Sequence, residues 1–581
     1  MSNDSSSFVD AARAWLAIDP DPQTRTELEA IIETDPDALR ELFGARLQFG
    51  TAGIRGRMGP GPGQLNRLLV RQVTAGLGAY LLQTLPDAAK RGVVVGGDAR
   101  RNSDVFAADV AGILGAMGIV VHWFDAPVAT PNLSHAVTHL GAAGGVMVTA
   151  SHNPPADNGY KVYWSNGAQI VPPHDAGISA AIDRVTPGTE VVAPLAALQS
   201  EGLLRPVSPK VFTRYIGEVL AQRVHPGHTV RAVYTAMHGV GYAPLRALLE
   251  AAGHDAVIPV TEQVEPDGAF PTVSFPNPEE KGALDLAKAT ATAADADVII
   301  AHDPDADRLA VAVPDASAQG GWRQLTGNEV GLLLAHDLLR HGDQSAPRLV
   351  ANTIVSSPLL GDIARAANAQ HVETLTGFKW IANAAIDHLA ATGGGFVLGF
   401  EEALGYSVGP VVRDKDGVGA GLMLLDLAGW CKSRGTTLAA HLEALFLEFG
   451  LAVSGQRSVK LPGAAGRARI EAVLAELRAS PPEHIGGLPV WRVRDVLTGR
   501  QEDRRTGQVT SFDLPVSNVL TYDLQGGSRV IARPSGTEPK IKIYVDVLEP
   551  VAADGVPAAR ARAMARLEVL ADDILNRTGL A

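Results

Sequence analysis

Short apolar runs recur along the chain, and polar residues follow most of them. These runs lie at residues 93–95, 146–148, 230–234, 298–300, 349–351 and 396–398. Brief apolar runs bounded by polar turns predict buried strands. Segments with helical spacing of apolar residues precede or separate these runs, including residues 65–85 and 243–252. Strands that alternate with helices predict α/β domains whose functional groups stand at the ends of strands.

The two ends of the chain have different patterns. Residues 8–46 repeat apolar positions at helical spacing, whereas residues 50–63 form a loop rich in glycine and proline. A helix predicted at 467–479 precedes scattered strands, including 529–532 and 540–547. We therefore predict an α/β fold of three related mixed-sheet α/β domains and a smaller C-terminal α+β domain. The predicted parts are a helical extension at 1–46 and domains at 47–215, 216–325, 326–452 and 453–581.

Composition narrows the class of protein. The 581 residues are 46% apolar and 19% charged, which suits a globular chain with several cores. A formal net charge of -13 gives no electrostatic support for nucleic-acid binding. No uncharged apolar run reaches the length of about 18 residues that a membrane helix needs, and the N-terminus does not resemble a signal peptide. We expect a cytoplasmic protein without a membrane role, in which the single cysteine, Cys431, is buried and inert.

A polar loop follows the strand predicted at 146–148. Its sequence is Thr149-Ala150-Ser151-His152-Asn153-Pro154. A core strand needs no such polar groups at its end, whereas a nucleophile exposed on a rigid support does. Ser151 is therefore a candidate nucleophile, while His152 taken alone is more often a structural residue.

Three aspartates alternate in the loop after the strand predicted at 298–300. Asp303, Asp305 and Asp307 repel one another at close range unless a cation neutralises them, and oxygen ligands suit Mg²⁺. An EF-hand does not fit, because its glycine and glutamate positions hold Arg308 and Pro314. A solvated acidic turn is the alternative interpretation.

Several segments have the composition of an anion or sugar site. The segment from Arg533 to Lys540 combines a guanidinium, hydroxyls and a glycine, which suits a phosphate, although an ordinary turn has a similar composition. Glu401 and Glu402 are able to accept hydrogen bonds from sugar hydroxyls or to begin a helix. Further candidates for ligand contact are Arg55, Lys161, Lys379 and Lys542. For Lys379 the alternative is a solvated surface charge, and for Lys161 it is a solvated charge at a strand edge. Neither a dinucleotide fingerprint nor a Walker loop is present.

Four of these motifs together resemble the α-D-phosphohexomutase superfamily, which includes phosphoglucomutases and phosphomannomutases. In the family's order, they resemble its phosphoserine loop, metal loop, sugar loop and phosphate loop. The four are Thr149-Ala150-Ser151-His152-Asn153-Pro154, Asp303-Pro304-Asp305-Ala306-Asp307-Arg308, Gly399-Phe400-Glu401-Glu402 and Arg533-Pro534-Ser535-Gly536-Thr537. The resemblance spans residues 47 to about 547 and implies four domains around a central cleft.

The resemblance implies a role for each candidate residue. Ser151 would carry a phosphoryl group and, with Asp303, Asp305 and Asp307, bind Mg²⁺. His152, Lys161 and Arg55 would serve the transfer as catalytic residues, with Lys161 a candidate proton donor or acceptor. The remaining residues would bind substrate: Arg308, Thr376, Gly377, Lys379, Glu401, Glu402, Lys415, Arg533, Ser535, Gly536, Thr537 and Lys542.

The implied reaction interconverts a sugar 1-phosphate and 6-phosphate through a bisphosphate intermediate, with a sugar bisphosphate as activator. Glucose is the first expected sugar and mannose the next. Ala403 departs from the serine often found in the family's sugar loop, and neighbouring motifs look closer to a branch with phosphopentomutases and glucose-1,6-bisphosphate synthases. Ribose or deoxyribose phosphates, bisphosphate synthesis and a non-catalytic sugar-phosphate sensor are therefore the alternatives. The expected partners are small sugar phosphates, and the sequence does not indicate an oligomeric state.

Overall fold

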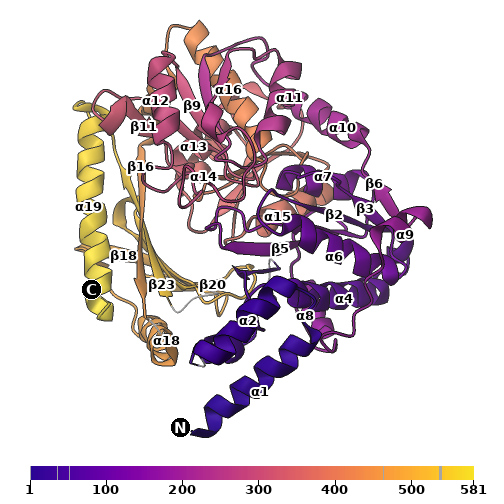
Figure 1. Ribbon diagram of the computed structural model, residues 1–581. Helices are drawn as coiled ribbons and strands as arrows, with labels where there is room; N and C mark the ends of the chain where they lie inside the picture. The colour runs from indigo at the N-terminus through magenta and orange to yellow at the C-terminus, as the bar shows by residue number, and fades with distance from the viewer. Residues whose placement is uncertain (1, 36, 51–52, 462, 536–539, 581) are drawn as a thin grey trace. The chain divides into compact units, whose positions relative to one another are not determined.

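The computed structural model describes residues 2–35, 37–50, 53–461, 463–535 and 540–580 (Figure 1). The chain divides into two units. Unit 1 comprises Met1–Leu325 and Gly405–Trp430, and unit 2 comprises Thr326–Leu404 and Cys431–Ala581.

Unit 1 begins with helices in the segment that was predicted to be a helical extension. It contains α1 (Ser2–Ile18), α2 (Pro22–Thr34) and α3 (Ala38–Phe43). Asp21 caps α2, because its carboxylate accepts a hydrogen bond from the backbone N–H of Gln23. The three helices share a small core built on Ala12, Leu28, Leu39 and Leu42.

A six-stranded mixed sheet follows, in the order β1-β5-β4-β2-β3-β6. Strands β4, β2, β3 and β6 are parallel, whereas β5 is antiparallel to both β4 and β1. The strands are β1 (Ile54–Arg57), β2 (Val93–Gly97), β3 (Val121–Trp123), β4 (Gly144–Val148), β5 (Asp157–Trp164) and β6 (Leu204–Pro206). The accompanying helices are α4 (Arg67–Thr84), α5 (Ala88–Arg91), α6 (Ser103–Ala116), α7 (Thr130–His139), α8 (His174–Ile182), α9 (Leu195–Ser200) and α10 (Pro209–Leu220).

One local prediction for this sheet was wrong. Residues 50–63 were expected to be a loop, but β1 lies within them and pairs with β5 from Ile54 opposite Tyr160 to Arg57 opposite Asp157. Only Ile54 of this strand is buried, so no apolar run marks it.

The second sheet of unit 1 has the order β11-β10-β9-β7-β8. Its strands are β7 (Ala232–Thr235), β8 (Val257–Pro259), β9 (Val298–Ala301), β10 (Ala310–Pro314) and β11 (Trp322–Gln324). Strand β9 is parallel to β7 and antiparallel to β10, and it is buried along its whole length. The loop of residues 302–309 follows β9 and leads into β10. Helices α11 (Tyr242–Ala252) and α12 (Asp285–Ala293) belong to this part, and unit 1 also contains β15 (Gly405–Val408) and the first part of α16 (Gly417–Ser433).

Unit 2 begins with the parallel strands β13-β12-β14. These are β12 (Arg348–Thr353), β13 (Gln370–Thr374) and β14 (Gly395–Glu401), with helices α13 (Gly327–His341), α14 (Leu359–Ala366), α15 (Phe378–Thr392) and α17 (Leu438–Phe449). A capping box starts α13, in which Thr326 and Glu329 each accept from the other's backbone N–H.

The C-terminal part of unit 2 is built on a largely antiparallel sheet, in the order β16-β23-β22-β21-β18-β19-β20, with β17 paired to β18. Its strands are β16 (Leu451–Lys460), β17 (His484–Ile485), β18 (Leu488–Asp495), β19 (Arg500–Asp503), β20 (Gln508–Ser511), β21 (Leu520–Leu524), β22 (Arg529–Pro534) and β23 (Lys540–Glu549). Helices α18 (Gly463–Ala479) and α19 (Gly555–Thr578) complete it.

The predicted fold class is confirmed: three α/β sheets precede a sheet-rich α+β part. The exact domain boundaries and the central cleft stay predictions. Cys431 is buried as expected. Within the described ranges, no helix has both the length and the apolar character needed to span a membrane.

Candidate functional site

Ser151 occupies a tight turn just beyond β4. Its φ of 54° lies in the left-handed region, a conformation that costs a residue with a side chain about 1–3 kcal/mol and persists only where the surroundings hold it. The residue is only 3% exposed. Its backbone N–H donates to the Thr149 hydroxyl at 2.9 Å. The serine is thus held in a strained position by the loop around it.

A buried arginine beyond the end of β2 holds the same loop. The Arg100 guanidinium donates to the carbonyls of Ser151 at 2.5 Å, Asn153 at 2.6 Å and Pro154 at 2.9 Å, with a longer bond to Asp157 at 3.3 Å. Because β2 and β4 are parallel neighbours, their carboxyl ends meet at one edge of the sheet. Sequence analysis did not identify Arg100 as a site residue.

The three predicted metal-binding aspartates lie together in the loop between β9 and β10. Asp303, Asp305 and Asp307 are each 0% exposed, and one ligand oxygen from each lies within 4.8 Å of the others. The Ser151 hydroxyl donates to Asp303 Oδ2 at 2.9 Å. The structure therefore brings the candidate nucleophile and the acidic cluster into direct contact within unit 1.

Positive side chains face this acidic cluster. Lys161 Nζ donates to Asp305 Oδ2 at 2.7 Å and to Asp307 Oδ2 at 2.8 Å. Lys415 Nζ lies 3.2 Å from Asp307 Oδ2, and the Arg308 guanidinium lies within 4 Å of both Asp303 and Asp307. The interpretation of Lys161 as a solvated strand-edge charge was wrong, because β5 lies between β1 and β4 and the residue is buried.

Burial and charge give the carboxyl groups different proton affinities. Burial raises the pKa of Asp303 well above its usual range, and the neighbouring Asp305 and Asp307 raise it further. For Asp307, the positive charges of Lys161 and Lys415 outweigh burial and lower the pKa. Burial alone would lower the pKa of Lys161, but the charges of Asp305 and Asp307 outweigh burial and raise it. The site therefore holds a concentrated negative charge that cations must offset.

The acidic cluster fits a divalent cation. Oδ1 of Asp305 and Oδ1 of Asp307 are buried and have no hydrogen-bond partner among the described residues. Buried polar atoms normally have a partner. An all-oxygen set of this charge suits Mg²⁺. Asp303, Asp305 and Asp307 are thus suited to hold the ion.

Two further predicted catalytic residues stand beside Ser151. The His152 Nδ1 atom lies 3.3 Å from the Ser151 hydroxyl. Burial lowers the pKa of His152 well below its usual value, and the charges of Arg308 and Arg55 lower it further, so the imidazole is neutral at pH 7. Arg55, on β1, donates from Nη1 to Asn153 Oδ1 at 3.1 Å. His152 thus belongs to the loop that carries Ser151, and Arg55 binds that loop from β1.

Unit 2 brings together most of the predicted substrate-binding residues that can be described. Glu401, at the end of β14, accepts a hydrogen bond from the Gly377 backbone N–H at 2.7 Å. Gly377 has a φ of 109°, which favours glycine at this turn. Arg533, on β22, donates to the Thr376 hydroxyl at 2.6 Å. The expected sugar loop and phosphate loop are therefore linked through residues 376–377.

The remaining substrate-binding candidates in unit 2 that can be described lie outside this hydrogen-bonded link between the two loops. The Glu402 carboxylate accepts hydrogen bonds from Ser356 at 3.0 Å and Thr353 at 3.3 Å. Lys379 is buried, with Nζ 5.5 Å from the Trp380 ring centroid, and Lys542 lies opposite Arg533 across β22 and β23. The Ser535 backbone N–H donates to the Lys540 carbonyl. Gly536 and Thr537 lie outside the described residues.

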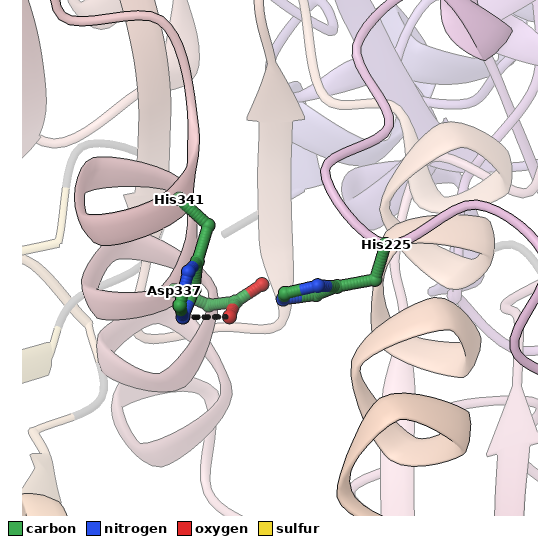
Figure 2. Close-up of side chains that lie close together, drawn as sticks. All are labelled: His225, Asp337 and His341. Carbon is green, nitrogen blue, oxygen red and sulfur yellow. Dashed lines mark ion pairs between the residues drawn. The ribbon is translucent and has the colours of Figure 1, made fainter. Parts of the chain in front are cut away.

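A pair of titratable side chains outside these groups lies on α13. Asp337 and His341 are one turn apart, with His341 Nε2 3.8 Å from Asp337 Oδ1 (Figure 2). His225, also drawn, belongs to unit 1, where its ring stacks on Trp430 at 4.6 Å. A histidine in the last turn of a helix, paired with an aspartate one turn earlier, favours the helix.

Comparisons with known proteins agree with the geometry. Models of phosphoglucomutase/phosphomannomutase alpha/beta/alpha domains I, II and III match residues 46–188, 210–319 and 326–449. A Haemophilus influenzae relative named probable phosphomannomutase is 44% identical, covering 83% of this chain and 93% of that protein. A Schizosaccharomyces pombe relative named probable phosphoribomutase is 38% identical, covering 91% and 92%. The crystal structure of a putative phosphomannomutase from Thermus thermophilus has a TM-score of 0.66 at 24% identity, covering 91% of this chain and 99% of that one, and so shares the fold.

Proposed function

This chain belongs to the phosphoglucomutase/phosphomannomutase family of phosphosugar mutases, and we propose that Ser151 carries the phosphoryl group that it transfers. The observation that carries the proposal is the hydrogen bond from the Ser151 hydroxyl to Asp303, inside a buried cluster of three aspartates. A structural serine needs no such cluster of charge around it, whereas phosphoryl transfer depends on positioning and electrostatic stabilisation.

We propose a reaction in two transfers. In the first, a sugar hydroxyl oxygen forms a bond to phosphorus as the bond from phosphorus to Ser151 Oγ breaks, which gives a sugar bisphosphate. In the second, Ser151 Oγ attacks the other phosphate of this intermediate, and the bond from that phosphate to the sugar breaks. The proton of the attacking hydroxyl passes to a base and returns to the leaving oxygen. The products are an isomeric sugar monophosphate and a reloaded serine.

The residues around Ser151 have proposed roles in this exchange. Lys161 is the proposed proton donor or acceptor, since its Nζ stands against Asp305 and Asp307. Arg55 and Arg308 offset the charge of the phosphoryl group, and neutral His152 supports the serine. Mg²⁺ on Asp303, Asp305 and Asp307 would supply charge neutralisation at the phosphoryl oxygens.

The residues of unit 2 have proposed roles in substrate binding. Glu401 is suited to accept hydrogen bonds from sugar hydroxyls, with Glu402 held beside it by Ser356 and Thr353. Arg533 is suited to a phosphate, because a guanidinium binds phosphate oxygens through paired hydrogen bonds. The proposed phosphate and sugar contacts also include Thr376, Gly377, Lys379, Ser535, Gly536, Thr537 and Lys542, together with Lys415 of unit 1.

Glucose phosphate is the proposed first substrate and mannose phosphate the next. A pentose phosphate is the second candidate, favoured by the relative named phosphoribomutase, which matches 91% of this chain. A sugar bisphosphate is the proposed activator, because it would restore the phosphoryl group to any serine that has lost it. A separate phosphoryl donor would instead make the enzyme a bisphosphate synthase.

A turnover panel tests these proposals. Glucose, mannose, glucosamine, ribose and deoxyribose 1-phosphates are each supplied with Mg²⁺, with and without glucose 1,6-bisphosphate. We expect isomer exchange with glucose phosphate the fastest and no exchange with Ser151→Ala, whose fold is checked by circular dichroism. Net accumulation of bisphosphate would favour the synthase, and full activity of Ser151→Ala would remove Ser151 from its proposed role.

A further inference from the structure

We propose that Arg100 is a positioning residue that fixes the conformation of the phosphoserine loop and thereby protects the phosphoryl group on Ser151 from water. The inference rests on the proposed function, because it concerns how the group carried by Ser151 survives between transfers. Arg100 has no role in the reaction as proposed above.

The guanidinium of Arg100 binds the loop through its backbone. Nη2 donates to the carbonyls of Ser151 and Asn153, and Nη1 donates to those of Pro154 and Asp157. Each nitrogen thus serves two carbonyls, and together they close the turn that contains Ser151. Carbonyls that turn inward to one cation fix the backbone dihedrals of the residues that bear them. This accounts for the left-handed φ of Ser151, which a loose loop would release.

Asp98 holds Arg100 and the loop at the same time. Its carboxylate accepts hydrogen bonds from the Thr149 hydroxyl at 2.7 Å, the Ser103 hydroxyl at 2.7 Å and the Arg100 backbone N–H at 3.0 Å. The Thr149 hydroxyl in turn accepts from the backbone N–H of Ser151. The residues after β2 therefore hold the serine at both backbone groups: Arg100 binds its carbonyl directly, and Asp98 acts on its N–H through the Thr149 hydroxyl.

An aromatic ring also covers the guanidinium. The centroid of the Phe270 ring lies 5.0 Å from Arg100 Cζ, and Phe270 is 3% exposed. A side chain at Gly268 would meet the backbone of Ala99 and Arg101 at 2.7 Å, so this segment lies directly on the strand end. Since Arg100 is itself 3% exposed, its hydrogen bonds are shielded from water and keep their strength.

Lysine cannot replace Arg100 in this position. Its single ammonium has three protons on one nitrogen, whereas four carbonyls here are spanned by two nitrogens of a rigid planar group. Arg100→Lys keeps the charge and releases part of the loop. A serine displaced by about 1 Å from its position for transfer loses on the order of 100-fold in rate, and a looser loop also admits water to the phosphorus.

The test compares phosphoserine lifetime with turnover. The full-length enzyme is loaded with glucose 1,6-bisphosphate and Mg²⁺, freed of excess ligand, and followed by intact mass for loss of phosphate from Ser151. For Arg100→Lys we expect hydrolysis about 10-fold faster and kcat about 100-fold lower, with KM for glucose 1-phosphate within about two-fold, since the proposed sugar contacts are elsewhere.

Arg223→Lys is the matched control. Arg223 is also an arginine of unit 1, and its side chain is largely buried. Its Nε and Nη2 donate to Asp426, each at 2.7 Å, and its Nη1 donates to the Ala252 carbonyl at 3.1 Å. We expect this variant to lose thermal stability but to keep the wild-type phosphoserine lifetime. Equal hydrolysis in both variants would show that any loosening of unit 1 has this effect, and would overturn the inference.

The remaining outcomes separate the inference from the proposed function. If the wild-type protein acquires no phosphoryl group on Ser151, the proposed function falls and the inference falls with it. If the wild type is labelled but folded Arg100→Lys has the same lifetime and kcat, only the inference falls. Should Arg100→Lys fail to fold, Phe270→Leu is the deciding variant. We expect its phosphoserine to hydrolyse a few-fold faster, because the guanidinium loses its aromatic cover. An unchanged phosphoserine lifetime in Phe270→Leu would overturn the inference.

Discussion

Replacing Glu373 by glutamine should weaken unit 2 in a way that depends on pH. Glu373, on β13, accepts hydrogen bonds from Arg494 of β18 and Arg529 of β22, each at 2.6 Å. It therefore links the parallel strands of unit 2 to its C-terminal sheet. The substitution keeps the size of the side chain and removes the negative charge from between two largely buried guanidinium groups.

The pKa of Glu373 sets the size of the effect. Burial alone would raise it, but Arg494 and Arg529 outweigh burial and lower the pKa from 4.5 to about 2. At about 1.4 kcal/mol for each tenfold change in proton affinity, the ionised carboxylate contributes about 3 kcal/mol to the free energy of unfolding. The folded state binds the proton less tightly than the unfolded state, so this contribution is complete above pH 4.5. It falls to about 1.4 kcal/mol at pH 3 and vanishes near pH 2.

Hydrogen exchange measures this free energy locally. Peptides covering residues 370–374, 488–495 and 529–534 report the opening of the three strands, and we expect Glu373→Gln to lower their opening free energy by about 3 kcal/mol at pH 7. The loss should shrink by about half at pH 3. Asp503→Asn is the control, since Asp503 pairs with Arg505 on the surface of the same unit, where an ion pair contributes little. The reasoning is refuted if Glu373→Gln behaves like this control, or if its loss is the same at both pH values.

Three further predictions concern single side chains. Asp307→Asn should lower turnover at least about 100-fold and raise the Mg²⁺ concentration needed for half-maximal activity, as measured by metal titration, because the variant loses one negative charge of the oxygen set. Thr376→Val should raise KM about 10-fold with a smaller change in kcat, since Arg533 loses the hydroxyl that orients it; an unchanged KM would contradict this. Cys431 should react with iodoacetamide at neutral pH only after denaturation, as followed by mass, because burial raises the pKa of its thiol to about 12.

Strands in the interior of the sheets were predictable from sequence because buried strands consist mainly of apolar residues. A parallel strand covered on both faces reads as a continuous apolar run, and β2, β4, β9 and β12 coincide with such runs. Strand β1 was missed, since its sequence of isoleucine, arginine, glycine and arginine has neither an apolar run nor a clear alternation. Its strand character comes from pairing with β5, whose residues lie 100 to 106 positions further along the chain, and local sequence does not contain that information.

The three aspartates of the site leave a signal in the sequence, whereas Arg100 does not. Asp303, Asp305 and Asp307 are recognisable because three like charges at alternate positions after a buried strand require a cation. Arg100 binds backbone carbonyls, which every residue possesses, so the residues around Ser151 contain no complementary signal. The remaining clue is positional: Asp98 and Arg100 follow one predicted strand and Ser151 follows another, and the carboxyl ends of neighbouring parallel strands meet. Sequence motifs therefore disclose the groups that contact one another through side chains, whereas a residue that acts on the backbone becomes visible only once strand order is known.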